Sequence, residues 1–238
     1  MGIRLIANGA DFSNSSIGRS FYIPKLSNLT HYYLGDDIKK NIIDNTDATV
    51  YQDTGITQGT HYTTFSGAVQ TNYIDTGANM FATGRATALM VKRCASNASR
   101  VILNRFDGTS TEAPVIIGNA FYAKTTSGWA STNFAHTAPD TFCIDAVTAV
   151  NGTNAVTACY EMLGGTVYKV VDTTNGTPYT NNGTVVFGGN PLSAYGDNKS
   201  VDIAAVMLFD DVLTTDELEV LYGYLRNKFM KDYSIVIS

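Results

Sequence analysis

Carboxylate side chains are the residues of this sequence that could cleave a glycosidic bond. Glycosidases need two of them about 5–10 Å apart, one as the acid and one as the nucleophile or base. Within a strand, such a pair would stand at positions i and i+2 or i+4 on one face. The chain has Glu at positions 112, 161, 217 and 219; the last two fit a helix start, and no acidic residue stands two positions from Glu161. The sequence therefore argues against a glycoside hydrolase, which is kept only as a third hypothesis.

Aromatic side chains beside polar ones could bind a sugar, because sugar rings have an apolar face. Trp129 is the single Trp and lies among small polar residues in the segment TSGWASTN. Tyr122 and Tyr195 could extend the same kind of surface. Each of the three could instead cap a sheet edge or fill a subunit contact, since 14 Tyr in one chain also suit a sheet surface or an interface. Trp129, Tyr122 and Tyr195 are the candidate carbohydrate-binding residues.

Oxygen-bearing loop residues could bind calcium, which takes roughly six to eight oxygen ligands. Asp197 and Asn198 in the segment AYGDNKS are the nearest candidates, and Asp107 is a second. Short polar residues of this kind also form ordinary turns. Apart from this calcium hypothesis, the sequence predicts no cofactor.

The histidines and cysteines are too widely spaced for a metal site. Each cysteine stands in an apolar run without CxxC spacing, which predicts small buried residues and folding in a reducing compartment; one disulfide with a free thiol is the alternative. The histidines predict packed or surface side chains. These residues are His31, His61, His136, Cys94, Cys143 and Cys159.

Short strands are the elements that must position all these side chains. From His31 onward, apolar runs recur between Asn-Gly and Gly-Gly turn signals, a pattern typical of a sandwich or barrel. About a dozen such strands need two packed sheets. Asn151-Gly152, between the runs 142–150 and 155–163, predicts a hairpin with a tight type I′ turn. We therefore predict an all-β fold, a two-sheet β-sandwich.

One C-terminal α-helix is expected to follow the last strand. Residues 201–209 predict a strand buried on both faces, and Thr214 with Glu217 forms the pattern of a capping box. Apolar residues then recur on one helical face. They are Leu218, Leu221, Tyr222, Leu225 and Phe229. This stripe predicts a helix that packs on the sandwich or on a partner subunit.

Several segments resemble laminin-G-like, or concanavalin A-like, jelly-roll modules. They are YTTFSG at 62–67, NYIDTG at 72–77, ALMV at 88–91 and the closing strand and helix start at 202–218. The segment ADFSNSSIGR at 10–19 resembles the lead-in before such modules in bacteriophage virion proteins, notably tail and fibre components. The resemblance implies a concanavalin A-like jelly-roll domain over residues 31–238, behind a lead segment, residues 1–30, that contacts the domain or a partner.

Two functional hypotheses follow from this resemblance and from the lack of a catalytic pattern. The first is a non-enzymatic phage structural protein, made in the host cytoplasm and carried in the virion as tail, fibre or capsid decoration, which assembles with other virion proteins as a homo-oligomer. The second is an adhesin that binds host-surface glycans. The net charge of −5, with scattered basic residues, predicts no nucleic-acid partner. No apolar stretch approaches the roughly 20 residues of a membrane span.

Overall fold

The structure is a computed structural model of the 238-residue chain. It describes residues 23–51, 54–80, 84–94, 100–109, 111–117, 120–125, 128–133, 141–150, 155–176, 183–192 and 198–237.

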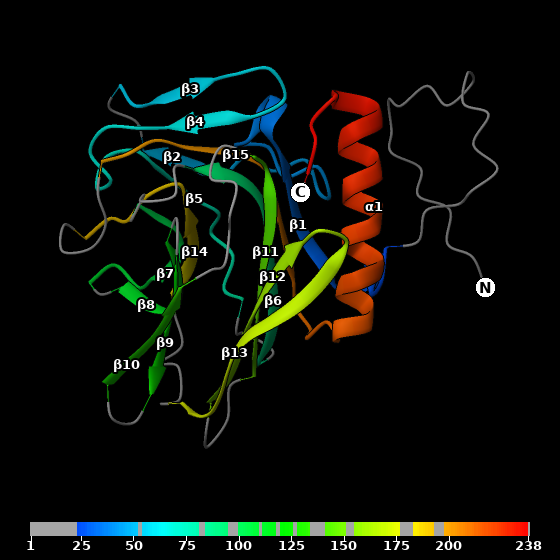
Figure 1. Cartoon of the computed structure of the whole chain (residues 1–238). Helices are drawn as coiled ribbons and strands as arrows, with labels where there is room; N and C mark the ends of the chain where they lie inside the picture. The colour runs from blue at the N-terminus through cyan, green and yellow to red at the C-terminus, as the bar shows by residue number, and fades with distance from the viewer. Residues whose placement is uncertain are drawn as a thin grey trace.

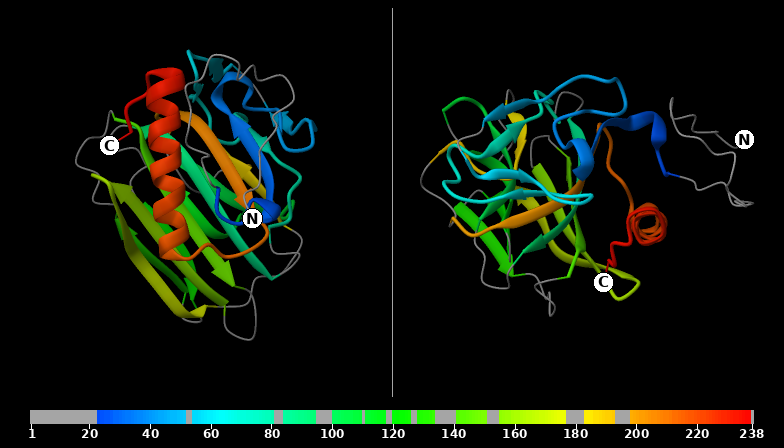
Figure 2. Two further views of the ribbon diagram at one scale, coloured as in Figure 1. Left: turned by 90° about the vertical axis from the view of Figure 1, so that its right-hand side faces the viewer. Right: turned by 90° about the horizontal axis from the view of Figure 1, so that it is seen from above.

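Two antiparallel sheets lie face to face, and helix α1 covers the outer side of one of them (Figures 1 and 2). The predicted all-β sandwich with a C-terminal helix is confirmed. The first sheet contains, in spatial order, β13 (Thr166–Gly176), β12 (Ala155–Leu163), β11 (Cys143–Val150), β6 (Arg85–Cys94), β15 (Val201–Phe209), β4 (Thr63–Phe65) and β3 (Ile56–Gln58), and β1 (Leu29–Leu34) also pairs with β15. The second contains β10 (Gly128–Asn133), β9 (Ala120–Thr125), β8 (Thr111–Ile117), β7 (Val101–Phe106), β14 (Thr184–Phe187), β5 (Tyr73–Asp75) and β2 (Thr49–Tyr51). The remaining elements are the 3-10 turns η1 (Leu26–Asn28) and η2 (Gly35–Asp37) and the helix α1 (Thr215–Tyr233).

The first sheet separates two apolar cores. Successive side chains of a strand point to opposite faces, so Met90 of β6 packs between the two sheets while Leu89 and Val91 pack toward α1. All five residues of the predicted helical stripe are buried in this second core. The molecule is therefore layered as sheet, sheet and helix. Within the part of the chain that the structure describes, no helix combines the length and apolar character that a membrane crossing requires.

The predicted hairpin is present, but its predicted turn is wrong. A two-residue Asn151-Gly152 turn would place Val150 opposite residue 153, whereas Val150 pairs with Val156. The observed register directs Tyr160 and Met162 into the core beneath α1. A shift by an odd number of residues would turn these side chains to the opposite face, so burial of the apolar face decides the register. Residues 151–154 lie outside the described residues.

The lead segment joins the domain earlier than predicted. Strand β1 begins at Leu29, and Ile23 is buried in the core beneath α1, so residues 23–30 are part of the packed domain. Strand β1 pairs with β15, and this pairing requires backbone from before residue 31. The resemblance of residues 10–19 falls on residues that the structure does not describe.

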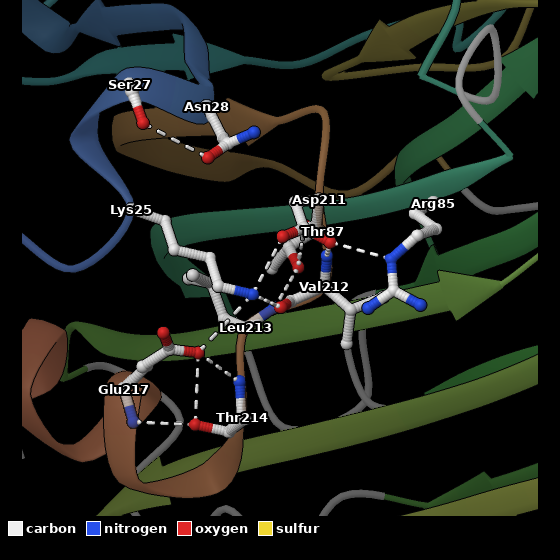
Figure 3. A network of polar contacts seen from close by, with 10 residues as sticks. All are labelled: Lys25, Ser27, Asn28, Arg85, Thr87, Asp211, Val212, Leu213, Thr214 and Glu217. Carbon is white, nitrogen blue, oxygen red and sulfur yellow. Dashed lines mark hydrogen bonds and ion pairs between the residues drawn. The ribbon is translucent and has the colours of Figure 1, made fainter.

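Lys25 connects the lead segment to the start of the helix (Figure 3). Its Nζ donates to Asp211 Oδ2 at 2.8 Å and to the Val212 carbonyl. Arg85 Nε donates to the other oxygen of Asp211 at 2.7 Å. Lys25 also lies 3.7 Å from Glu217 of the capping box. Asp211 thus holds the lead segment, β6 and the turn before α1 together.

The predicted capping box is present at the start of α1. Glu217 N donates to Thr214 Oγ1 at 3.3 Å, and Thr214 N donates to Glu217 Oε2 at 2.8 Å (Figure 3). Both contacts satisfy backbone or side-chain groups that the first helical turn leaves without an intrahelical partner. The helix consequently begins at Thr215.

We expect Asp211→Asn to destabilise the chain at neutral pH and to have little effect in acid. Hydrogen bonds from Lys25 and Arg85 outweigh burial and hold the pKa of Asp211 well below its ordinary value. The carboxylate therefore stabilises the folded chain above a pH of about 4, and this contribution is lost as the pH falls further. Because the Asp211 side chain is 26% exposed, the free energy of unfolding of the variant should be about 1 kcal/mol below that of wild type at neutral pH. Urea denaturation from pH about 7 down to about 2 measures it.

The control for this experiment is Asp47→Asn. Asp47 forms an ion pair with Lys40, 3.2 Å apart, and its side chain is 64% exposed. Exposed pairs of this kind contribute little, so this variant should track wild type at every pH. A gap between wild type and Asp211→Asn that stays constant over the pH range would contradict the assignment.

Candidate functional site

The structure places two of the three candidate sugar-binding residues on neighbouring strands. Trp129 lies in β10, a strand that the sequence analysis did not predict, and Tyr122 lies in β9. Trp129 is opposite Lys124, and Ser131 is opposite Tyr122. Because residues two apart share a face and paired residues face the same way, the backbone positions of all four lie on one face of this hairpin. Tyr195 lies outside the described residues.

The shared face is the outer face of the second sheet. Phe121 and Ile116 point inward, since both belong to the core between the sheets. Tyr122 instead packs, partly exposed, against a separate small cluster formed by Val101 and Ala120. Among the strands that the structure describes, β10 is the last of this sheet, so the hairpin's outer surface lies beside the edge of the described sheet. Trp129 and Tyr122 are diagonal neighbours on this face, with Lys124 and Ser131 at the two intervening positions. Aromatic, hydroxyl and amine residues gathered in this way suit stacking and hydrogen bonding to a sugar ring.

The calcium candidates do not form a visible site. Asp197 lies outside the described residues, and Asn198 is exposed. Asp107 is committed to a turn, because its Oδ1 accepts from Thr109 N at 2.8 Å and from Thr109 Oγ1 at 2.9 Å. In the described ranges, no group of three or more His, Cys, Asp or Glu side chains could hold a metal ion. Calcium binding stays a prediction from the sequence alone.

The histidines and cysteines that the structure describes have packing partners. His31 stacks on Tyr33, and burial lowers the pKa of His31. His61 Nδ1 donates to Asp36 Oδ1 at 2.9 Å. The three cysteines are free, so the alternative of one disulfide is wrong; Cys143 and Cys159 are buried, and Cys94 is partly buried. Burial raises the pKa of the Cys159 thiol well above its ordinary value.

An arginine packed beside two neighbouring aromatic rings lies where β4, β6 and β15 meet. The Arg93 guanidinium carbon is 5.2 Å from the Tyr62 ring centroid and 4.7 Å from that of Phe142. Arg93 Nη2 and Nε donate to Asp202 Oδ2 at 2.5 and 2.9 Å, and Asp202 Oδ1 accepts from Thr64 at 2.6 Å. With two aromatic rings beside it and two of its nitrogens donating to Asp202, the guanidinium is committed to packing.

A group of charged residues lies inside the sandwich, and the sequence analysis missed it. Lys92 Nζ and Asp145 Oδ2 are 2.7 Å apart, and both side chains are 0% exposed. Burial is the largest single influence and would lower the pKa of Lys92, but Asp145 together with Cys143 and Cys94 raises that pKa on balance. Glu161, 2% exposed, is directly opposite Asp145. Asp145 and Glu161 lie on two different strands, so a search for paired acids along single strands missed them. The register of the β11–β12 hairpin would have identified them.

No protein-family model and no curated protein sequence matches this chain. Solved structures do match it. The binding domain of Paraclostridial Mosquitocidal Protein 1 matches with a TM-score of 0.55 and 16% identity, over 84% of this chain and 53% of that one. Botulinum neurotoxin type C matches with a TM-score of 0.59 and 14% identity, over 84% and 51%. A Trypanosoma rangeli sialidase mutant matches with a TM-score of 0.63 and 12% identity, over 84% and 33%.

The chain shares the β-sandwich fold of these proteins. It spans about half the length of the two toxin chains and a third of the sialidase chain. At these identities the likeness concerns the fold, and fold alone does not carry function.

Proposed function

We propose that this chain is a non-enzymatic module that binds glycans through the outer face of the β9–β10 hairpin. The observation that carries the proposal is the register that places Trp129 and Tyr122 on one outer face beside a sheet edge. The similar folds give support. To enter cells, botulinum neurotoxin type C depends on interaction with two ganglioside molecules. A Trypanosoma rangeli sialidase forms a complex with sialic acid.

The non-enzymatic part of the proposal rests on where the paired acids lie. Asp145 is 0% exposed and Glu161 is 2% exposed, and both strands turn these residues toward the core between the sheets. A glycosidase must bring its two carboxyl groups to either side of a bound sugar. A closed apolar core does not admit one, which supports binding in place of hydrolysis.

We expect Trp129→Ala and Tyr122→Ala each to weaken glycan binding about tenfold, the size of one lost aromatic contact. A glycan array that includes gangliosides and other sialylated glycans identifies the ligand, and titration of the best one compares the variants. The control is Tyr168→Ala, which removes a 52% exposed tyrosine from β13 of the other sheet. If both hairpin variants keep wild-type affinity, or if the control loses affinity equally, the glycan site does not lie on this hairpin.

A virion protein that mediates assembly is the second candidate function. Its support is the resemblance of residues 10–19 to the lead-in of phage tail and fibre components. It is compatible with glycan binding, since a module of this kind could attach a particle to a host surface. Mass spectrometry of purified particles tests it, and absence of the chain from particles would refute it.

A further inference from the structure

Lys92 and Asp145 are placed as reactants for an amide bond. They stand on adjacent strands, with Lys92 opposite Cys143 in the β6–β11 register and Asp145 two residues further along β11. Their side chains face the interior between the sheets, because Met90 and Val147, at alternate positions of the same two strands, belong to that core. Lys92 Nζ lies 2.7 Å from Asp145 Oδ2, and the carbon that it would attack, Asp145 Cγ, is bonded to that oxygen.

We propose that Lys92 and Asp145 become covalently joined by an amide between Nζ and Cγ, formed by the folded chain itself. In the reaction, a proton passes from the ammonium to the carboxylate, and the freed lone pair of Nζ attacks Cγ. The bond from Cγ to one oxygen then breaks, and that oxygen leaves as water. Of the three ammonium hydrogens, one remains on the amide nitrogen and two depart with the water. No oxidant, reductant or other reactant is needed.

The surroundings favour the uncharged product. Two charges buried in an apolar interior carry a large desolvation cost, whereas the neutral amine and acid, with the same total charge, carry a much smaller one. The amide removes both charges permanently. Both side chains are 0% exposed, so bulk water has no access to reverse the reaction.

Glu161 is the group that can carry protons between the reactants. It is directly opposite Asp145 on β12, and directly opposed residues of antiparallel strands lie within reach of each other's side chains. We assign it the role of accepting a proton from the lysine side and returning it to the departing oxygen. Arg105 of β7, in the facing sheet, is also fully buried and is paired with Val185 of the same core.

The bond would tie β6 to β11, two neighbouring strands in the middle of the first sheet, and would do so in every folded molecule. It is independent of glycan binding, because it lies inside the sandwich and not on the outer face of the second sheet. A module exposed to pulling or proteolysis would gain resistance to unfolding from such a link.

The test is the mass of the purified full-length chain under denaturing conditions. We expect wild type to be lighter than its sequence by one water molecule, and a digest to contain one branched peptide joining Lys92 to Asp145. The proposal would be overturned if the folded wild-type chain had the full mass of its sequence, or if the loss of water mapped to another site.

Three variants distinguish a chemical role of these residues from a purely structural one. Glu161→Gln should keep the full mass while its circular dichroism shows a folded sandwich, and Glu161→Asp should restore part of the water loss. Asp145→Asn should lose ammonia in place of water, because the amide nitrogen is then the leaving group. If Glu161→Gln is crosslinked as fully as wild type, the role assigned to Glu161 is refuted while the bond itself stands.

Discussion

Leu221→Asp should lower the free energy of unfolding by at least about 4 kcal/mol, enough to unfold much of the chain. Leu221 is 0% exposed at the centre of the apolar stripe that α1 packs on the first sheet. Removing a buried leucine side chain alone costs about 2–5 kcal/mol, and the aspartate adds a charge that the core beneath α1 cannot solvate. Thermal and urea denaturation followed by circular dichroism measure the loss.

The neighbouring residue supplies the matched control. Val220 is 48% exposed on the solvent side of the same helical turn. Val220→Asp makes a similar change in the same helix and should alter stability by no more than about 0.5 kcal/mol. If the two variants have the same melting temperature, α1 is peripheral to the fold and its apolar stripe packs against something other than the first sheet.

The sequence predicted the helix well because local chemistry specifies it. The capping box of Thr214 and Glu217 and the spacing from Leu218 to Phe229 act within one element, so no knowledge of distant segments is needed. The two strands of the β11–β12 hairpin were also predicted, since each is an apolar run beside a turn signal. What the helix packs against was left open, because a stripe indicates burial without naming its partner.

The interior charges show where sequence reasoning fails. Asp145 and Glu161 are each a single acidic residue in an apolar strand, and only the pairing of the two strands brings them together. The Asn151-Gly152 turn signal suggested a register that places Asp145 opposite Ala158. The burial pattern of β12 outweighed that local signal. In the same way, Trp129 lies in a strand of small polar residues whose propensity did not mark it as a strand.

The second large effect is expected from Lys92→Met, which should cost about 3–5 kcal/mol of unfolding free energy from the buried charge that it leaves behind, in addition to the contribution of any covalent link. Methionine keeps most of the length and the apolar stem of lysine, so little packing is lost. Asp145, however, keeps a buried negative charge after its lysine partner at 2.7 Å is gone, and breaking a buried pair from one side has this cost. Lys228→Met is the control, because Lys228 pairs with the 42% exposed Asp232 on the surface of α1. That change should cost no more than about 0.5 kcal/mol.

The double variant Lys92→Met/Asp145→Leu then distinguishes an ion pair from a covalent link. Replacing both partners of a buried ion pair by apolar residues is often neutral or stabilising, so an ion pair alone predicts recovery to wild-type stability or better. A crosslink between residues 92 and 145 would itself contribute about 4 kcal/mol by restricting the unfolded chain. We therefore expect the double variant to recover part of the loss from Lys92→Met and to remain about 4 kcal/mol less stable than wild type. Full recovery would show that wild type draws its stability from the charges and packing, and that no bond joins the two strands.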